Sequence, residues 1–291
     1  MDYFSTFSGI GGFELGIKQA YESILHKPEV TELHAEQNRS SDNRNELQGT
    51  SASCIGYSEI DKYAVQVYKK HFPKHKNYGD ITKIRASTLP DFDLICGGFP
   101  CQSFSIAGKR GGFDDTRGTL FFDIARIVRT KRPRYLFLEN VKGLLSHDGG
   151  KTFDTIIRTI DELGYDCQWQ VCNSKNFGVP QNRERVFIVG HLRGESRPKV
   201  FPVKDASKVC NKRNENKETI CQTIKARYPA DWNGNYIEGE RIRRLTPIEC
   251  ERLQGFPDGW TSCVSDSQRY KCLGNAVTVN VIEYIASKLI K

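Results

Sequence analysis

The order of hydrophobic and polar positions predicts a chain that alternates between strands and helices. Short apolar runs predict strands at Tyr3–Phe7, Cys54–Ile60, Phe92–Cys96, Tyr135–Leu138, Asp166–Cys172 and Arg185–His191. Between them, apolar residues recur with the helical period, which predicts helices that run through Glu22 and over Asp61–Phe72, Thr119–Thr130 and Thr152–Leu163. Repeated alternation of this kind favours an α/β fold with a parallel, doubly wound sheet and helices on both faces.

Two segments interrupt the alternation. Residues 27–53 are polar and poor in apolar side chains, so we expect them to form a surface insertion. Residues 192–244 contain 13 Lys or Arg against 7 Asp or Glu, and therefore carry +6 of the chain's net charge of +8. We expect a small, basic lobe at residues 191–244 and a larger domain formed by residues 1–190 together with residues 245–291.

Composition narrows the class of protein. The chain has 291 residues, of which 38% are hydrophobic and 27% are charged, which is typical of a globular rather than a disordered protein. No apolar run is long enough to span a membrane, and the N-terminus lacks the pattern of a secretory signal, so we expect a cytoplasmic location. The 10 cysteines do not have the spacing of zinc or disulfide sites, so no metal is expected. The basic charge is compatible with a polyanionic partner.

A glycine-rich turn follows the first predicted strand. Gly9, Gly11 and Gly12 lie where that strand passes into a helix, and such a turn lets the backbone approach an anionic ligand. The pattern is G-x-G-G rather than G-x-G-x-x-G, so a simple tight turn explains the glycines equally well. Glu59 and Asp80 follow the next strand ends, where an acidic residue can bind ribose hydroxyls. Together these residues predict an adenosine-containing ligand at the carboxyl ends of the strands.

Four further residues have side chains suited to catalysis. Cys101 follows a buried strand on a loop shaped by glycine and proline, where it is either a nucleophile or a buried structural thiol. Glu139 ends the next strand, where it is either a general acid whose pKa is raised by burial or a surface glutamate. Arg183 and Arg185 lie on the same side of an extended segment, where they hold a carbonyl or phosphate or form a solvated charge cluster.

Six motifs in this order resemble those of the cytosine-5 DNA methyltransferases. They are FSGIGG (Phe7–Gly12), GGFPCQSFS (Gly97–Ser105), ENV (Glu139–Val141), QNRER (Gln181–Arg185), RRLTPIECERLQGFP (Arg243–Pro257) and GNAVTVNV (Gly274–Val281). Each motif alone is weak, but six in order with compatible spacing are specific. The resemblance covers the chain apart from residues 27–53 and most of residues 192–241, and it implies a Rossmann-like methyltransferase sheet with a target-recognition lobe.

The resemblance also implies a mechanism. Cys101 matches the nucleophile that adds to carbon-6 of cytosine, which makes carbon-5 able to take a methyl group from S-adenosylmethionine. Glu139 matches the residue that protonates or hydrogen-bonds ring nitrogen-3. Arg185 matches the residue that holds the base carbonyl, and Arg183 is its neighbour in the site. Because a thiol cannot reach a stacked base, the cytosine must be flipped out of double-stranded DNA.

Cofactor residues carry over in the same way. Phe7 and Ile60 match contacts to adenine, Glu59 matches the ribose ligand, and Asp80 matches the acceptor of the adenine amino group. The glycine turn matches the methionine end, and the C-terminal helix is expected to fold back beside the first strand. The expected cofactor-binding residues are Phe7, Gly9, Ile10, Gly11, Gly12, Glu59, Ile60, Asp80, Ile81, Pro100, Asn275 and Ala276.

DNA contacts are expected from two regions. Residues 103–116 match the family's mobile active-site loop, whose glycines permit closure over a flipped base. The recognition segment is short, which indicates a short or loosely read target site. The expected DNA-binding residues are Gln102, Ser105, Lys109, Arg110, Lys225, Arg227, Arg241 and Arg243.

Two other functions remain open from the sequence. The short recognition segment keeps open the RNA-modifying branch of the same family, although GGFPCQSFS resembles the DNA-acting members. A catalytically silent binding subunit would lack Cys101, Glu139 or Arg185, and all three are present. Methyltransferases that act on the adenine amino group are disfavoured because their Pro-Pro tetrapeptide is absent. A monomer is expected, with a restriction endonuclease of the same system as a possible functional partner.

Overall fold

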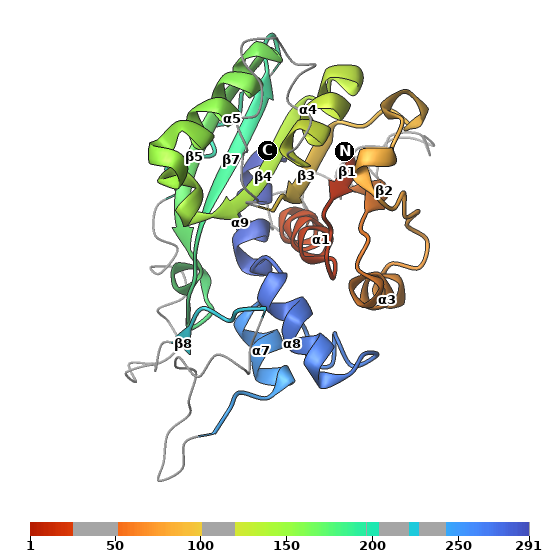
Figure 1. Ribbon diagram of the computed structural model, residues 1–291, viewed down its shortest axis with the longest axis vertical. Helices are drawn as coiled ribbons and strands as arrows, with labels where there is room; N and C mark the ends of the chain where they lie inside the picture. The colour runs from red at the N-terminus through yellow and green to blue at the C-terminus, as the bar shows by residue number, and fades with distance from the viewer. Residues whose placement is uncertain (26–51, 101–119, 196, 204–220, 227–242, 291) are drawn as a thin grey trace, which may run out of the picture.

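The computed structural model describes residues 1–25, 52–100, 120–195, 197–203, 221–226 and 243–290 (Figure 1). Its centre is a six-stranded sheet in the order β2-β1-β3-β4-β7-β5. The strands are β1 (Asp2–Thr6), β2 (Ser53–Ser58), β3 (Leu94–Gly98), β4 (Tyr135–Val141), β5 (Tyr165–Asn173) and β7 (Glu184–Leu192). Two shorter strands, β6 (Gln181–Asn182) and β8 (Cys221–Gln222), pair in parallel outside this sheet.

The sheet is parallel from β2 to β4, but β7 runs antiparallel to both of its neighbours. The expected parallel, doubly wound sheet is therefore found from β2 to β4, and the expected strand direction is wrong only at β7 among the six strands of the described sheet. The physical reason is the connection between β5 and β7, which contains no crossover α-helix. A short connection of this kind joins antiparallel strands, whereas parallel neighbours need a longer crossover.

Helices cover both faces of the sheet (Figure 1). They are α1 (Gly12–Leu25), α3 (Lys62–His71), α4 (Leu120–Lys131), α5 (Lys151–Glu162), α7 (Pro247–Leu253), α8 (Asp266–Asn275) and α9 (Val279–Leu289). Short 3₁₀ turns lie at Ile81–Lys83, Ala86–Thr88, Lys142–Leu145, His147–Gly150 and Ser174–Phe177. Along β3, Leu94 and Cys96 join a core cluster with α1 and α9, whereas Ile95 joins a second cluster with α4 and α5. The apolar runs of the central strands are thus buried on both faces.

The C-terminal helix α9 packs directly against α1. A Cβ added at Gly16 of α1 would lie 2.7 Å from Cβ of Ile282 in α9, so the glycine permits the close approach of the two helices. Ile282 shares its core cluster with Tyr3 of β1. A third cluster joins α3, α7 and α8 to the start of α1. The last 45 residues therefore pack beside the N-terminal strand and helix, next to the carboxyl ends of the sheet.

The described ends of the predicted lobe pack on the main domain. Phe201 and Val203 are buried in the cluster that contains α1 and α9. Gln168 and Gln170 of β5 accept hydrogen bonds from backbone N–H groups of this segment and donate to its carbonyls. At the other end, Ile224 is fully buried against α7 and α8. The rest of the predicted lobe, and residues 27–51 of the predicted insertion, lie outside the described residues.

None of the described helices is long and apolar enough to cross a membrane.

Candidate active site

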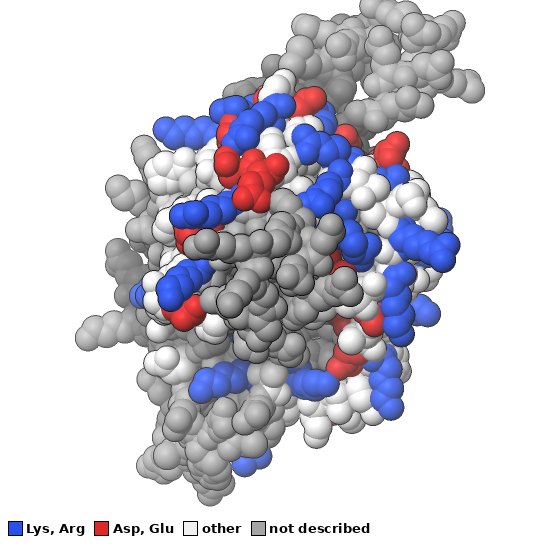
Figure 2. Space-filling model, turned by 45° about the horizontal axis from the view of Figure 1, so that its top comes forward, with Lys and Arg blue, Asp and Glu red and all other residues white. Residues whose placement is uncertain are grey.

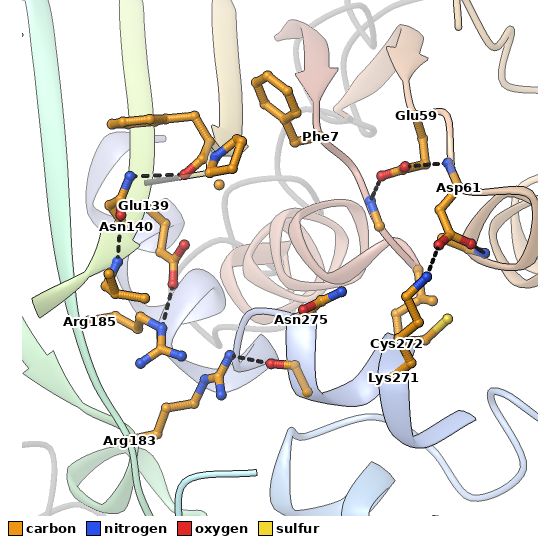
Figure 3. A pocket seen from close by; sticks show the side chains of 18 residues that line it. Phe7, Glu59, Asp61, Glu139, Asn140, Arg183, Arg185, Lys271, Cys272 and Asn275 are labelled. Carbon is orange, nitrogen blue, oxygen red and sulfur yellow. Dashed lines mark hydrogen bonds and ion pairs between the residues drawn. The ribbon is translucent and has the colours of Figure 1, made fainter. Parts of the chain in front are cut away.

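A cavity of about 400 Å³ lies at the carboxyl ends of β1, β2, β3 and β4, between the sheet and α8 (Figure 3). This is the position at which open α/β sheets bind their ligands. Its lining comes from six parts of the chain: Phe7, Gly9, Ile10, Glu59, Asp61, Ala64, Gly98, Phe99, Pro100, Glu139, Asn140, Val141, Arg183, Arg185, Lys271, Cys272, Gly274 and Asn275. Figure 3 shows Glu139 and the two arginines on one side and Glu59, Asp61 and Lys271 on the other.

The turn after β1 is held open toward the cavity by unusual backbone angles. Phe7 has a φ of 51° and Gly9 a φ of 55°. A positive φ is costly for a residue with a side chain, and such conformations concentrate at functional sites. The strain turns the chain sharply between β1 and α1, so that the Phe7 ring and the backbone of Gly9 both line the cavity.

Glu59 connects this turn to the start of α3. Its Oε2 accepts a hydrogen bond from the backbone N–H of Gly9 at 2.9 Å. Its Oε1 accepts from the N–H groups of Ile60 and Asp61, both at 2.8 Å. The carboxylate is thereby fixed at the cavity wall, with its remaining lone pairs available to a hydroxyl donor.

Asp61 and Lys271 form an ion pair that also lines the cavity. Oδ1 of Asp61 caps α3, accepting from the N–H groups of Tyr63 and Ala64, while Oδ2 lies 2.6 Å from Nζ of Lys271. Burial alone would raise the pKa of Asp61, but the hydrogen bond from Lys271 and those from the α3 backbone outweigh it, so the pKa is lowered. The pair ties α8 to α3. Sequence reasoning missed it, because the two residues are 210 positions apart and neither belongs to a recognisable motif.

Glu139, which is buried, and Arg185, which is partly buried, form an ion pair between neighbouring strands. Nε of Arg185 lies 3.1 Å from Oε1 of Glu139, which is 8% exposed. Burial raises the pKa of Glu139 above its ordinary value, although the positive charges of Arg185 and Arg183 oppose the shift. A Cβ at Gly98 would lie 2.8 Å from the other carboxylate oxygen, so the glycine keeps that space open. A carboxyl group in this state is suited to share a proton with a bound ligand.

Asn140 holds the loop that leads to Cys101. Its Nδ2 donates to the carbonyl of Phe99 at 2.9 Å, and its Oδ1 accepts from the N–H of Val141 at 2.8 Å. The side chain is buried, and its bond to Phe99 is shielded from water. Phe99 and Pro100 both line the cavity. Cys101 itself, the predicted nucleophile, lies outside the described residues and directly follows Pro100.

Cys272 also lines the cavity and was not predicted. Burial raises the pKa of its thiol to about 12. Because the thiolate is the nucleophilic form of cysteine, this side chain is unsuited to attack at neutral pH. Burial likewise raises the pKa of Cys54, Cys96, Cys167, Cys172, Cys221 and Cys250.

Arg183 lines the cavity, but its guanidinium is largely engaged with the backbone. Nη1 donates to the carbonyl of Ile224, and Nη2 donates to the carbonyls of Gly274 and Ala276. Its Nε is buried and has no hydrogen-bond partner among the described residues. Desolvation by burial lowers the pKa of this group to about 9, and the neighbouring Arg185 charge adds to the shift. The sequence prediction joined it to Arg185 as a catalytic residue, whereas its contacts resemble those of a structural link.

Three predicted cofactor residues, Gly11, Gly12 and Ala276, contact other parts of the protein instead of the cavity. A Cβ at Gly11 would lie 2.6 Å from the Phe72 ring, and one at Gly12 would lie 2.7 Å from Cγ2 of Val277. Ala276 is buried, and its carbonyl accepts from Arg183. None of the three lines the cavity. They shape the turn and the α8–α9 connection that carry the lining residues.

Three other predicted cofactor residues lie away from the lining. Ile60 is 75% exposed at the surface beside Glu59. Asp80 caps a 3₁₀ turn, where its Oδ1 accepts hydrogen bonds from the hydroxyl and the backbone N–H of Thr82. These hydrogen bonds lower the pKa of the Asp80 carboxyl group. Ile81 is buried in the core cluster of α4 and α5. Their roles in cofactor binding stay predictions.

Few of the predicted DNA contacts are described. Lys225 and Arg243 are exposed, and Arg243 forms an ion pair with Glu249 at 2.7 Å. Gln102, Ser105, Lys109, Arg110, Arg227 and Arg241 lie outside the described residues. Figure 2 shows many Lys and Arg side chains along one edge of the face that it draws, with acidic side chains among them.

The fold is that of a methyltransferase. A DNMT2 mutant from Spodoptera frugiperda superposes with a TM-score of 0.72 over 100% of this chain and 99% of its own, at 18% identity. A putative DNA modification methyltransferase encoded within an Escherichia coli prophage has a TM-score of 0.66 over 99% and 98%, at 19% identity. These likenesses concern the fold.

The family follows from the sequence comparisons. The model of the C-5 cytosine-specific DNA methylases matches residues 1–236 and 197–291. The Type II methyltransferase M1.ScrFI of Lactococcus lactis subsp. cremoris is 42% identical over 80% of this chain and 71% of its own. M.HhaI of Haemophilus parahaemolyticus is 35% identical over 82% of this chain and 88% of its own. The chain therefore belongs to the C-5 cytosine-specific DNA methylases, and its activity is DNA cytosine-5 methylation.

Proposed function

We propose that the protein methylates carbon-5 of a flipped cytosine in double-stranded DNA, with S-adenosylmethionine as methyl donor and Cys101 as nucleophile. The observation that carries this proposal is the ion pair of the buried Glu139 with Arg185, which lies in one cavity with Glu59 and with Pro100, the residue before Cys101. In this proposal the cytosine binds beside Glu139 and Arg185, and the cofactor binds on the side of the cavity that Glu59 lines.

The pair of Glu139 and Arg185 suits a cytosine ring. Arg185 donates to Glu139 through Nε and to the carbonyl of Glu184 through Nη1 at 2.7 Å, which fixes the plane of the guanidinium. A guanidinium held in this way can donate to the base carbonyl and stabilise negative charge as the Cys101 thiolate adds to carbon-6. The raised pKa of Glu139 suits it to hydrogen-bond or protonate ring nitrogen-3.

The opposite half of the cavity fits S-adenosylmethionine. The aromatic ring of Phe7 suits contact with adenine, and the fixed carboxylate of Glu59 suits the ribose hydroxyls. The amide of Asn275 suits the polar methionine end. The volume of about 400 Å³ falls within the range of small-molecule sites. When bound, S-adenosylmethionine supplies an activated methyl group. The chain's own residues bind it, orient it and exclude water.

We further propose that the enzyme belongs to a restriction–modification system, because relatives with up to 42% identity are named Type II methyltransferases. A restriction endonuclease that cuts the unmethylated site would then be its functional partner, with no direct contact required. We expect a monomer that acts on DNA in the cytoplasm. Double-stranded DNA is the preferred substrate over RNA because the family model is that of DNA methylases.

Covalent capture tests the proposal. The full chain is incubated with tritiated S-adenosylmethionine and a random-sequence duplex library that contains 5-fluorocytosine, and the products are separated under denaturing conditions. Release of the cysteine requires the loss of a proton from carbon-5, and the fluorine at this position cannot be lost as a cation. The enzyme is therefore expected to remain bonded to the methylated base. Bisulfite sequencing of plasmid DNA methylated by the wild-type enzyme identifies the target site.

Matched variants assign the nucleophile. Cys101→Ala is expected to form no adduct but to bind the cofactor. Cys167→Ala, on β5 and away from the cavity, is expected to form the adduct like the wild type. Loss in Cys272→Ala together with retention in Cys101→Ala would assign the nucleophile to Cys272 instead. An adduct on fluorinated transfer RNA but none on duplex DNA would move the enzyme to RNA substrates.

A further inference from the structure

Arg183 connects two segments that are far apart in the sequence. Nη1 lies 3.0 Å from the carbonyl oxygen of Ile224, while Nη2 lies 3.1 Å from that of Gly274 and 2.7 Å from that of Ala276. The side chain is 2% exposed. Hydrogen bonds from a charged donor in a dry environment are stronger than those between neutral groups, so these contacts hold the two segments firmly.

The two segments also touch each other directly. A Cβ added at Gly274 would lie 2.3 Å from the backbone nitrogen of Ala226 and from the backbone carbon of Lys225. Only glycine allows this approach of one backbone to the other. The C-terminal end of α8 with its C-cap Ala276 and the segment Cys221–Ala226 are therefore held together, and Arg183 is the side chain that bonds to both.

Buried glutamines extend the same connection. Oε1 of Gln181, two positions before Arg183, accepts from the N–H of Ile224 at 3.1 Å, and its Nε2 donates to the carbonyl of Leu253 at 2.8 Å. Gln254 donates through Nε2 to the carbonyl of Leu273 at 2.7 Å. Both glutamines are fully buried. The segment from β6 to the start of β7, which contains Gln181, Arg183 and Arg185, is thus bonded on one side to segment 221–226 and on the other to the end of α8.

In the proposed reaction, one of the two segments is next to the cofactor and the other is next to the region expected to bind DNA. Asn275, between Gly274 and Ala276, lines the cofactor half of the cavity. Segment Cys221–Ala226 continues into the last part of the predicted recognition region. Because Arg183 bonds to both segments, a displacement of one would change the hydrogen-bond geometry to the other.

We propose that Arg183 is a positioning residue that couples cofactor binding to DNA binding, rather than a catalytic residue that contacts cytosine. Its guanidinium fixes Asn275 relative to the recognition segment, so the binding of either ligand alters the affinity for the other by the same factor. Lysine cannot replace it, because a single ammonium on a flexible stem does not present the rigid fork that reaches three carbonyls. This inference rests on the proposed function.

Calorimetry of Arg183→Lys tests the coupling. S-adenosylhomocysteine is titrated into the full chain with and without a duplex oligonucleotide that carries the methylation site of the wild-type enzyme. In the wild type we expect the duplex to change the affinity by roughly tenfold, within the range usual for coupled sites. In Arg183→Lys the ratio is expected to fall close to one, with weaker cofactor binding. Arg132→Lys is the matched control, because Arg132 donates to the Leu163 carbonyl at the opposite end of β4, away from the cavity.

The outcomes separate the possible roles of Arg183. A lower kcat in Arg183→Lys at saturating cofactor and DNA, with the coupling ratio unchanged, would overturn the proposal and make Arg183 a catalytic residue. If thermal unfolding shows that this variant is not folded, Gly274→Ala separates the same two segments and leaves the arginine in place. It is expected to lose the coupling, and a normal ratio there would contradict the proposal. Failure of the wild type to bind S-adenosylhomocysteine would instead overturn the proposed cofactor, and the coupling role with it.

Discussion

At the scale of single residues, the proposed chemistry makes a specific prediction for Glu139. Its raised pKa results from burial, and the neighbouring Arg185 keeps the carboxyl oriented. Glu139→Gln keeps the shape but cannot transfer a proton, so single-turnover methyl transfer is expected to slow by about 10²–10⁴. Glu195→Gln, which alters an exposed ion pair with Arg134, is the control and is expected to react at the wild-type rate. A rate within a factor of a few of wild type in Glu139→Gln would make Glu139 a structural residue.

Glu14 is a second buried carboxylate, and its effect is on stability. It is 1% exposed on α1, where its Oε1 accepts from the Tyr68 hydroxyl at 3.0 Å. Burial raises its pKa from 4.5 to about 7. The folded state therefore holds this proton more tightly than the unfolded state, and the stability that it contributes below pH 4.5 is lost as the pH rises through 7.

Glu14→Gln is expected to remove this pH dependence. At about 1.4 kcal/mol per pKa unit, the wild type should lose up to about 3 kcal/mol more of its free energy of unfolding between pH 4.5 and 8 than the variant. Urea unfolding at a series of pH values measures the difference. Glu22→Gln, in an exposed ion pair with Lys18 on the same helix, should follow the wild-type curve. Parallel curves for wild type and Glu14→Gln would show that Glu14 is ionised when folded.

The residue-level chemistry was partly visible in the sequence. Glu59 directly follows β2 and Glu139 lies near the end of β4, and the carboxyl ends of parallel strands meet at one edge, so their meeting in one cavity could be predicted. Arg185 lies at the start of β7 instead and reaches this edge because β7 runs antiparallel, a direction that the hydrophobic pattern does not predict. The pair of Asp61 and Lys271 could not, because the contact depends on how α8 packs beside α3. The hydrogen bonds of Arg183 could not be predicted either, because its partners are backbone carbonyls, which every residue type has.

At the scale of elements, a helix–loop contact shapes the proposed cofactor site from a distance. Trp260, in the loop after α7, donates through Nε1 to the carbonyl of Ile10 at 2.9 Å. Its ring stacks on His71 of α3 with ring centroids 3.5 Å apart. Ile10 lines the cavity, so the indole holds the glycine turn in place from the C-terminal part of the chain.

Trp260→Phe is expected to weaken cofactor binding and leave the chemistry unchanged. The ring stays, but the buried carbonyl of Ile10 loses its donor, at a cost of about 1–3 kcal/mol. We expect KM for S-adenosylmethionine to rise about tenfold or more, with kcat within about twofold of wild type. Trp169→Phe, at a position 48% exposed on β5, is the control. A fall in kcat of about tenfold with an unchanged KM would contradict a positioning role.

The elements themselves were predicted closely where the pattern is strong. The helix expected at Asp61–Phe72 is found at Lys62–His71, since Asp61 is its N-cap, and that expected at Thr152–Leu163 is found at Lys151–Glu162. β4 extends three residues beyond the predicted Leu138, because Glu139 and Asn140 are buried despite their polarity. The direction of β7 was not predicted, since an apolar run shows that a strand exists but not which way it runs.

At the scale of the whole molecule, the net charge of +8 is concentrated in residues 192–244. Such a distribution favours a polyanion through the release of counterions, an effect that weakens as salt is added. The logarithm of the DNA association constant is therefore expected to fall linearly with the logarithm of salt concentration. Each neutralised phosphate contributes a slope of about −0.9. Fluorescence anisotropy with labelled duplex DNA measures this slope.

Two arginines of the basic segment make the prediction specific. Arg227 and Arg241 lie outside the described residues, and the sequence predicts that both meet DNA. If they contact phosphates, Arg227→Gln and Arg241→Gln should each make the slope shallower by about one and weaken binding to all sequences alike. If one of them reads a base, its variant should instead lose discrimination against altered sites, with affinity for the true site reduced most. Arg158→Gln on α5, an equal loss of charge in an exposed pair with Asp154, should change neither quantity. An unchanged slope together with unchanged discrimination in both segment variants would mean that neither Arg227 nor Arg241 contacts DNA.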